Sequence, residues 1–196
     1  MRDPGPIAVE TRRNHIPGEA GVWVLIFGEM TVFAAIFASF LHYHHFDVAG
    51  FTAAQAELTK AIGLANTLLL LTSSLLVAKA VHATRLGEIT RAPRLFALAL
   101  ACALGFIALK SFEYYELFAR GVAVDSHMFF GFYFGLTALH LGHVVIGSIL
   151  LALLARVTRN PLAKPMHYAL VESAGCFWHM VDLLWIVIFP LLYLVE

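Results

Sequence analysis

Five long hydrophobic stretches constrain this chain more than any other feature of its sequence. A helix needs about 20 mostly apolar residues to cross the hydrocarbon core of a bilayer. Five segments meet that requirement: residues 20–41, 62–83, 95–117, 128–155 and 172–194. The chain is 60% hydrophobic and 13% charged, whereas a soluble domain carries about twice that charged share. The sequence therefore predicts an all-α fold, an integral membrane bundle of five transmembrane helices.

The segments between these stretches indicate a single domain, residues 1–196. Glycine or proline interrupts the apolar pattern in all four of them, at residues 47–52, 91–94, 121–125 and 160–165. No repeat or linker divides the chain, and Pro190 falls late in the last stretch, where proline kinks a helix or marks its final turns. Cys102 and Cys176 lie inside apolar stretches and are expected to be free thiols. The formal net charge of zero gives no indication of nucleic acid binding.

The basic residues predict how the bundle is oriented. Lysine and arginine concentrate in the loops on the cytoplasmic side of a membrane. The N-terminus and the second and fourth connections hold nine of them: Arg2, Arg12, Arg13, Arg85, Arg91, Arg94, Arg156, Arg159 and Lys164. The first and third connections hold only Lys60 and Arg120. We therefore expect a cytoplasmic N-terminus and a C-terminus on the outside.

Acidic and histidine side chains interrupt the hydrophobic stretches. A charge at membrane depth costs several kcal/mol unless it is paired or faces the bundle interior. At a rise of 1.5 Å per residue, five of these residues fall in one layer, about 8 to 15 Å from the cytoplasmic face. That layer holds Glu29, His140, His143, His179 and Asp182, and Glu172 shares a helical stripe with the last two. We expect Glu29 to reach a histidine of this layer, either as an ion-pair partner or as a protonated donor.

Four interpretations of these six residues stay open. The first is a buried polar network of acid–histidine pairs that fixes helix packing. The second is a metal site, because imidazole and carboxylate bind zinc, iron and copper, although the spacings differ from the Glu-x-x-His pairs of di-iron bundles. The third is a proton relay, for which the outer half offers only Lys110 and Glu113, spaced to pair with each other. The fourth is a ligand or lipid-headgroup site. Small residues are expected to allow close helix contact: Gly28, Gly135, Gly142, Gly147 and Gly175.

Four segments, taken in order, resemble subunit III of the haem–copper oxidase superfamily. The first is GVWVLIFGEMTVFAAIFASF with its membrane-buried Glu29, and the second is ANTLLLLTSSLLVAKAVHA, residues 65–83. The third is FGFYFGLTALHLGHVVIGSILL, residues 130–151, with two histidines three apart. The fourth is VESAGCFWHMVDLLWIVIFPLLYL, residues 171–194. The long form of the family has seven helices, and the first two have no counterpart here. Within the five-helix forms, LKSFEY at 109–114 and the ending at 177–194 look closest to the NorE-like branch, which is associated with nitric oxide reductases.

The resemblance implies a non-catalytic accessory subunit of a respiratory complex in the bacterial inner membrane. Its expected partners are membrane lipids and a haem–copper-type catalytic subunit, which would hold haem and copper or non-haem iron. No cofactor and no metal is expected in this chain. Its expected role is to support assembly, stability or proton uptake of the catalytic subunit. The alternatives are subunit III of a bacterial quinol or cytochrome c oxidase proper, and a small independent membrane transporter or metal-dependent membrane protein.

Overall fold

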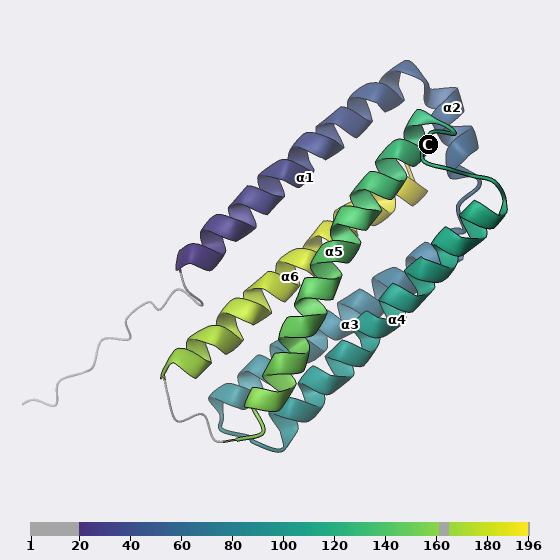
Figure 1. Ribbon diagram of the computed structural model, residues 1–196. Coiled ribbons are helices and arrows are strands. Elements are labelled where there is room, and N and C mark those ends of the chain that lie inside the picture. The colour runs from purple at the N-terminus through teal and green to yellow at the C-terminus, as the bar shows by residue number, and fades with distance from the viewer. Residues whose placement is uncertain (1–19, 161–164, 196) are drawn as a thin grey trace, which may run out of the picture.

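A computed structural model describes residues 20–160 and 165–195 of the protein. That part of the chain holds six helices: α1 (Ala20–Phe46), α2 (Val48–Gln55), α3 (Lys60–Arg85), α4 (Arg91–Ala119), α5 (Met128–Val157) and α6 (Pro165–Tyr193). All except α2 are long and apolar enough to cross a membrane, and no strand occurs among the described residues (Figure 1). The prediction of an all-α bundle with five transmembrane helices is confirmed.

The long helices extend beyond the apolar segments from which they were predicted. The α4 helix begins at Arg91 rather than Leu95, and α6 begins at Pro165, seven residues before Glu172. Hydropathy detects only the part of a helix that lies in hydrocarbon, and a helix continues into the headgroup region where polar side chains are solvated. Pro93 lies within the first turn of α4, where its missing N–H costs no hydrogen bond.

The short helix α2 is an element that the sequence did not predict. Its residues were expected to form a loop because Gly50 interrupts the apolar pattern. The structure instead caps a helix with Asp47, whose carboxylate accepts a hydrogen bond from the Gly50 backbone N–H at 3.1 Å. Phe51 anchors the helix in a cluster of rings with Phe40 and Phe129. This helix marks one end of the bundle, which is called the α2 end below.

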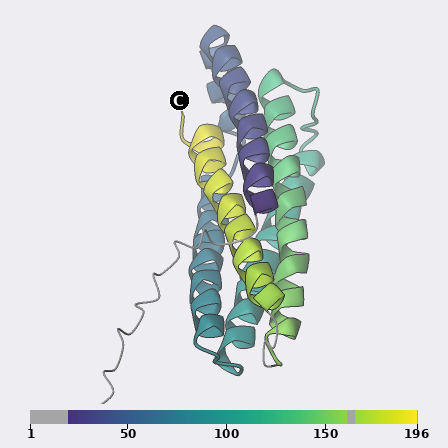
Figure 2. The same ribbon diagram turned by 90° about the vertical axis from the view of Figure 1, so that its left-hand side faces the viewer.

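The helices form a group of four with α1 on its outside. The α3 helix packs along α4 and α6, and α5 packs along α4 and α6. The α1 helix contacts α5 and α6, and its far end meets α2 (Figures 1 and 2). Accordingly, α6 is the most buried of the five spans and α1 is the least buried. Much of the α1 surface is therefore exposed on the outside of the bundle.

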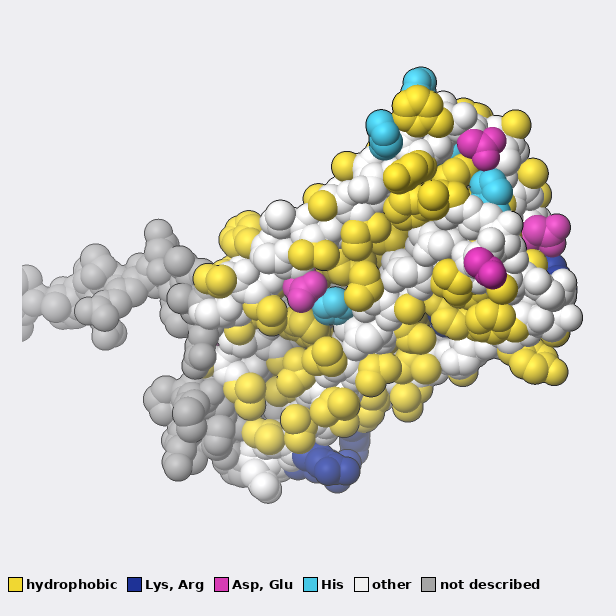
Figure 3. Space-filling view, turned by 45° about the horizontal axis from the view of Figure 1, so that its top comes forward, with side chains coloured by type: hydrophobic (Ala, Val, Ile, Leu, Met, Phe, Trp, Pro, Cys, Tyr) yellow, Lys and Arg dark blue, Asp and Glu magenta, His cyan; other side chains and the backbone are white. Residues whose placement is uncertain are grey.

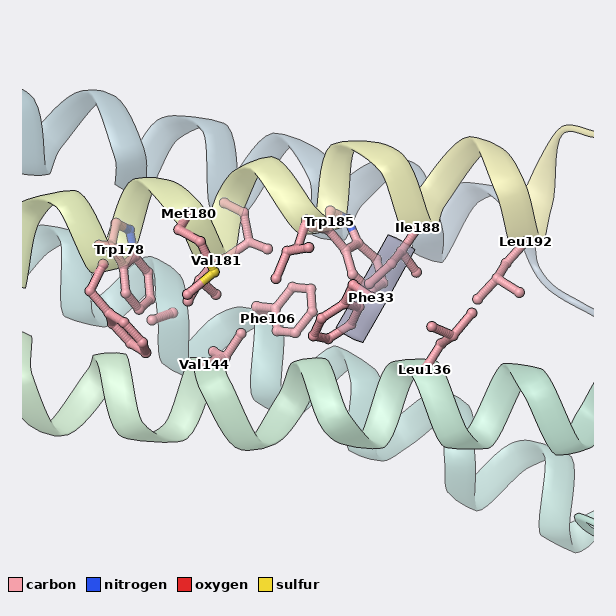
Figure 4. Packing of buried hydrophobic residues seen from close by; sticks show 14 of the residues in the cluster. Phe33, Phe106, Leu136, Val144, Trp178, Met180, Val181, Trp185, Ile188 and Leu192 are labelled. Atoms are coloured by element: carbon pink, nitrogen blue, oxygen red, sulfur yellow. The ribbon is translucent and has the colours of Figure 1, made fainter. Parts of the chain in front are cut away.

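Large buried side chains of α6 form the core of the bundle. Trp178, Val181, Trp185 and Ile188 project from α6 toward residues of α4 and α5, and Phe33 joins them from α1 (Figure 4). Trp178 packs directly on Gly147 of α5, where a Cβ atom would lie only 2.5 Å from the indole ring.

Only two of the five small residues proposed for helix contacts have a neighbour that a Cβ would meet. They are Gly147 and Gly175, the latter against Val81 at 3.2 Å. At Gly28, Gly135 and Gly142, a Cβ would have nothing within 4 Å.

Candidate functional site: polar clusters inside the bundle

A buried charged cluster lies in the half of the bundle nearer α2. Lys110 of α4 is completely buried, and its ammonium group donates three hydrogen bonds. The acceptors are Glu113 Oε2 at 2.8 Å, the Tyr193 hydroxyl at 2.9 Å and the Tyr133 hydroxyl at 3.1 Å. The Tyr193 hydroxyl in turn donates to Glu113 Oε1 at 2.7 Å. All three ammonium protons and both carboxylate oxygens therefore have partners.

The cluster joins three helices, because Tyr133 belongs to α5 and Tyr193 to the last turn of α6. A second contact between α4 and α5 lies beside it, where the Tyr114 hydroxyl and the Thr137 hydroxyl are 2.6 Å apart. A buried ion pair is favourable only when further hydrogen bonds satisfy both partners, and the two tyrosines provide them here. The i,i+3 spacing indicated that Lys110 and Glu113 pair. The tyrosines were missed because the sequence does not show how α5 and α6 are rotated toward α4.

The second polar contact joins α1 to α5. Glu29 Oε2 lies 3.2 Å from His143 Nε2, and the two side chains are 30% and 14% exposed. The other ring nitrogen, His143 Nδ1, lies 2.8 Å from the Leu139 carbonyl oxygen. Phe33 of α1 and Phe177 of α6 border the imidazole ring. The pair therefore lies where α1, α5 and α6 meet.

The Leu139 carbonyl determines how protons are placed in this pair. A carbonyl oxygen only accepts hydrogen bonds, so His143 Nδ1 carries a proton. Nε2 faces the Glu29 carboxyl group at ion-pair distance. The expected approach of Glu29 to a histidine of this layer is therefore present, and it is to His143.

His140 lies one turn before His143 but in different surroundings. It is completely buried, and its ring packs against Phe106 of α4 and Trp185 of α6 at centroid distances of 5.6 and 5.1 Å. Neither ring nitrogen has a hydrogen-bond partner among the described residues. The structure therefore places His140 in the aromatic core, apart from the pair that His143 forms with Glu29.

The remaining candidates lie along the seam between α3 and α6. Ser74 Oγ and His179 Nδ1 are 2.7 Å apart, and Asp182 lies three residues after His179 with its buried Oδ1 lacking a hydrogen-bond partner among the described residues. Near the end of the bundle away from α2, Arg85 pairs with Glu172 at 3.0 Å. A groove of about 230 Å³ runs between these two places, lined by both members of the Arg85–Glu172 pair, His82, Cys176 and His179 among others.

The six residues singled out in the sequence thus occur in three separate places. Glu29 and His143 pair between α1 and α5, His140 lies in the core, and the other three line the α3–α6 seam. Ser74 and Arg85 complete the seam and were not among the predicted site residues. Among residues 20–160 and 165–195, no three His, Cys, Asp or Glu side chains come together in a way that could hold a metal ion. The chemistry that these groups offer is hydrogen bonding and the holding of protons.

Five apolar spans joined by buried hydrogen bonds and ion pairs define a multi-span membrane protein. A family model for cytochrome c oxidase subunit III matches residues 14–196. The chain therefore belongs to the cytochrome c oxidase subunit III family, as the resemblance of its four segments predicted.

Several curated relatives of this family align over 90% or more of the chain. Cytochrome c oxidase subunit 3 of Synechocystis sp. is 26% identical, over 96% of this chain and 85% of the relative. Cytochrome c oxidase subunit 3 of Corynebacterium diphtheriae is 24% identical, over 100% of this chain and 96% of the relative. A haem–copper oxidase subunit I+III of Aeropyrum pernix is 28% identical, over 90% of this chain but only 22% of that larger protein.

Proposed function

We propose that this chain is a non-catalytic accessory subunit, a single transmembrane domain docked on the catalytic subunit of a haem–copper-type respiratory complex. The observation that carries the proposal is the Aeropyrum pernix relative, whose name joins subunits I and III in one protein. In that relative, a segment similar to this chain is covalently attached to a subunit I. This chain would make the same association without a covalent link, as a separate bundle in the membrane.

The polar clusters support a structural role for the chain itself. Lys110, Glu113 and the two tyrosines bond one another, and His179 and Arg85 likewise bond groups of the neighbouring helix. Such contacts fix how helices pack in lipid, where apolar surfaces alone give little preference. The redox centres, haem and copper or non-haem iron, would be held by the partner. The role proposed for this chain is to support assembly, stability or proton uptake of that partner.

The finer assignment that we propose is the NorE-like branch, in which the partner would reduce nitric oxide. It is supported by the LKSFEY segment, which supplies Lys110 and Glu113 of the buried cluster, and by the ending at 177–194, which supplies Tyr193. The alternative is subunit III of an oxygen-reducing quinol or cytochrome c oxidase, and the relatives named above support it. The identity of the copurified catalytic subunit separates the two.

We further propose that the protein lies in the bacterial inner membrane with its N-terminus in the cytoplasm. Five of the nine basic residues that support this orientation occur at the end of the bundle away from α2, and Arg120 lies at the α2 end. Figure 3 shows a cluster of lysine and arginine side chains at the lower edge of the face that it draws and a smaller patch at its right-hand edge. The other four, Arg2, Arg12, Arg13 and Lys164, lie outside the described residues.

Purification of the tagged full-length chain from its own membranes in mild detergent tests this function. We expect a haem-containing catalytic subunit to copurify, and we expect deletion of the gene to lower the yield or operating lifetime of that complex while its haem spectrum persists. A chain that purifies alone and transports a solute in vesicles would favour an independent transporter. Stoichiometric metal, haem absorbance or oxygen or nitric oxide reduction by the isolated chain would contradict an accessory role.

A further inference from the structure

We propose that the face formed by α1 and α5 around the Glu29–His143 pair is the surface that the catalytic subunit covers. The partner would place a transmembrane helix there, with a side chain that donates a hydrogen bond to Glu29. This inference rests on the proposed function, because it takes the catalytic subunit as the partner. It specifies which side of the bundle contacts the catalytic subunit and which hydrogen bond that contact requires.

The Glu29–His143 pair lies well inside the span of α1 and is partly exposed on the surface of the bundle. Glu29 lies nine residues after the start of α1, which corresponds to a depth of about 13 Å. Its side chain is nevertheless 30% exposed at the surface of the bundle. On the face drawn in Figure 3, an acidic side chain and a histidine adjoin one another on a surface that is otherwise largely hydrophobic. A polar group exposed to hydrocarbon at this depth is costly, so the pair requires a polar environment that lipid tails do not supply.

The hydrogen bonding of the pair defines what that environment must offer. The His143 ring is bonded to the Leu139 carbonyl through Nδ1, and its Nε2 faces Glu29 Oε2 at 3.2 Å. The second carboxyl oxygen, Glu29 Oε1, has no partner among the described residues. The complementary group is therefore a hydrogen-bond donor, such as a serine, threonine, asparagine or tryptophan side chain on a facing helix.

The surface next to the pair has room for a closely packed helix. Gly28 precedes Glu29 and Gly142 precedes His143, and both glycines are exposed with nothing within 4 Å of a Cβ position. Gly135 continues this surface along α5. Small residues let the backbones of transmembrane helices approach closely, which brings short donor side chains within reach of a carboxyl group. A Cβ at any of these three positions would meet no other helix of the described chain, so this surface is open to a helix of the partner.

The other polar surface of the bundle does not require a protein cover in the same way. His179 lies in the groove of the α3–α6 seam, which extends to Arg85 and Glu172 near the end of the bundle. Water and lipid headgroups at that end can solvate the polar groups of the groove. Exposed aliphatic side chains, which lipid tails match, occur on α3 and α4 as well as on α1 and α5, for example Leu68, Leu104, Val32 and Ile146. The feature that assigns the docking surface to α1 and α5 is the partly exposed Glu29–His143 pair.

Site-specific photocrosslinking in membranes that hold the whole complex tests the assignment. A photoreactive amino acid at Val32 of α1 or Ile146 of α5 should give adducts with the catalytic subunit. The matched controls are Leu68 of α3 and Leu104 of α4, which are similarly exposed at 57% and 54% against 53% and 54% for the test positions. We expect at least a tenfold excess of adduct at the two test positions. Adducts mainly from the controls, or adducts of two copies of this chain from the test positions, would overturn the proposal.

Two substitutions of Glu29 test the chemistry of the contact. Glu29→Gln keeps a neutral group that can donate to His143 Nε2 and accept from the partner, whereas Glu29→Leu keeps neither bond. Hydrogen bonds between transmembrane helices contribute about 0.6 to 2 kcal/mol, which corresponds to roughly a 3- to 30-fold change in association. We expect Glu29→Leu to lose the partner by that factor on detergent dilution and Glu29→Gln to retain it. Equal retention by both variants would overturn the proposed hydrogen bond.

The two proposals fail in different ways. A wild-type chain that carries no catalytic subunit through purification refutes the proposed function, and the docking surface with it. A chain that purifies with the catalytic subunit but crosslinks to it through α3 and α4 refutes the docking surface alone.

Discussion

Replacing Lys110 with methionine should destabilise the bundle by about 3–5 kcal/mol, the usual cost of breaking a buried ion pair from one side. The ammonium group is fully buried and makes three hydrogen bonds of 2.8 to 3.1 Å, which methionine cannot replace. Glu113 would keep only the Tyr193 hydroxyl as a donor in its buried surroundings. Against a typical total stability of about 5–15 kcal/mol, this loss is large enough to measure and small enough to leave some folded protein.

A second substitution distinguishes this mechanism from a simple packing defect. In the double variant Lys110→Met/Glu113→Gln, the uncompensated carboxylate is removed while an acceptor for Tyr193 is kept. The double variant should therefore be more stable than Lys110→Met alone. The matched control is Arg91→Met, because the Arg91–Glu88 pair has the same i,i+3 separation but is exposed at 67% and 35%, and its loss should cost less than about 1 kcal/mol.

The assay is equilibrium unfolding of the full-length protein in mixed micelles with increasing denaturing detergent, followed by tryptophan fluorescence. A Lys110→Met protein as stable as the Arg91→Met control would refute the argument that the cluster holds α4, α5 and α6 together. A double variant less stable than Lys110→Met would refute the argument that the unpaired carboxylate is the source of the cost.

Three further outcomes follow from the same structure. Gly147→Ala should cost about 1–3 kcal/mol in that assay, because its Cβ would lie 2.5 Å from a buried tryptophan ring, whereas Gly142→Ala should be close to neutral. Reporter fusions after Arg120 should be active outside the cytoplasm and fusions after Arg159 inside it, and the reverse pattern would contradict the proposed orientation. Arg85→Gln should cost no more than about 1 kcal/mol, because the Arg85 side chain is 54% exposed, and a double-mutant cycle with its acidic partner on α6 measures the pair directly.

The sequence was sufficient to predict the five spans because hydropathy reports directly which residues lie in hydrocarbon. It was also sufficient for contacts within one helix, as the spacing of Lys110 and Glu113 shows. It did not reveal α2, whose short length and Gly50 concealed a helix that begins with an Asp47 cap. Helix ends in the headgroup region were likewise missed, because they are polar and resemble loops.

The rotation of each helix about its axis was the quantity that the sequence could not supply. Residues three apart on a helix differ by about 60° in direction, although they share one face in a coarse description. That angle separates His140, which is completely buried, from His143, which reaches the bundle surface and Glu29. In the same way, Glu172 shares a stripe with His179, yet it pairs with Arg85, a residue that sequence reasoning used only to predict orientation. Depth could be estimated from residue counting, whereas direction depends on how the helices pack.

The separation of Lys110 and Glu113 by three residues has a consequence for how α4 enters the membrane during synthesis. A helix is inserted into the membrane before it packs against other helices. The polar side chains of a newly inserted span can therefore pair only with side chains of the same helix. Lys110 and Glu113 lie on one turn of one helix, 2.8 Å apart in the folded bundle, so their charges can neutralise each other already at that stage. The hydroxyl groups of Tyr133 and Tyr193 arrive later, with α5 and α6. An inserted α4 would thus carry a paired lysine and glutamate instead of two separate charges. The remaining hydrogen bonds would form when α5 and α6, which are synthesised later, pack against it.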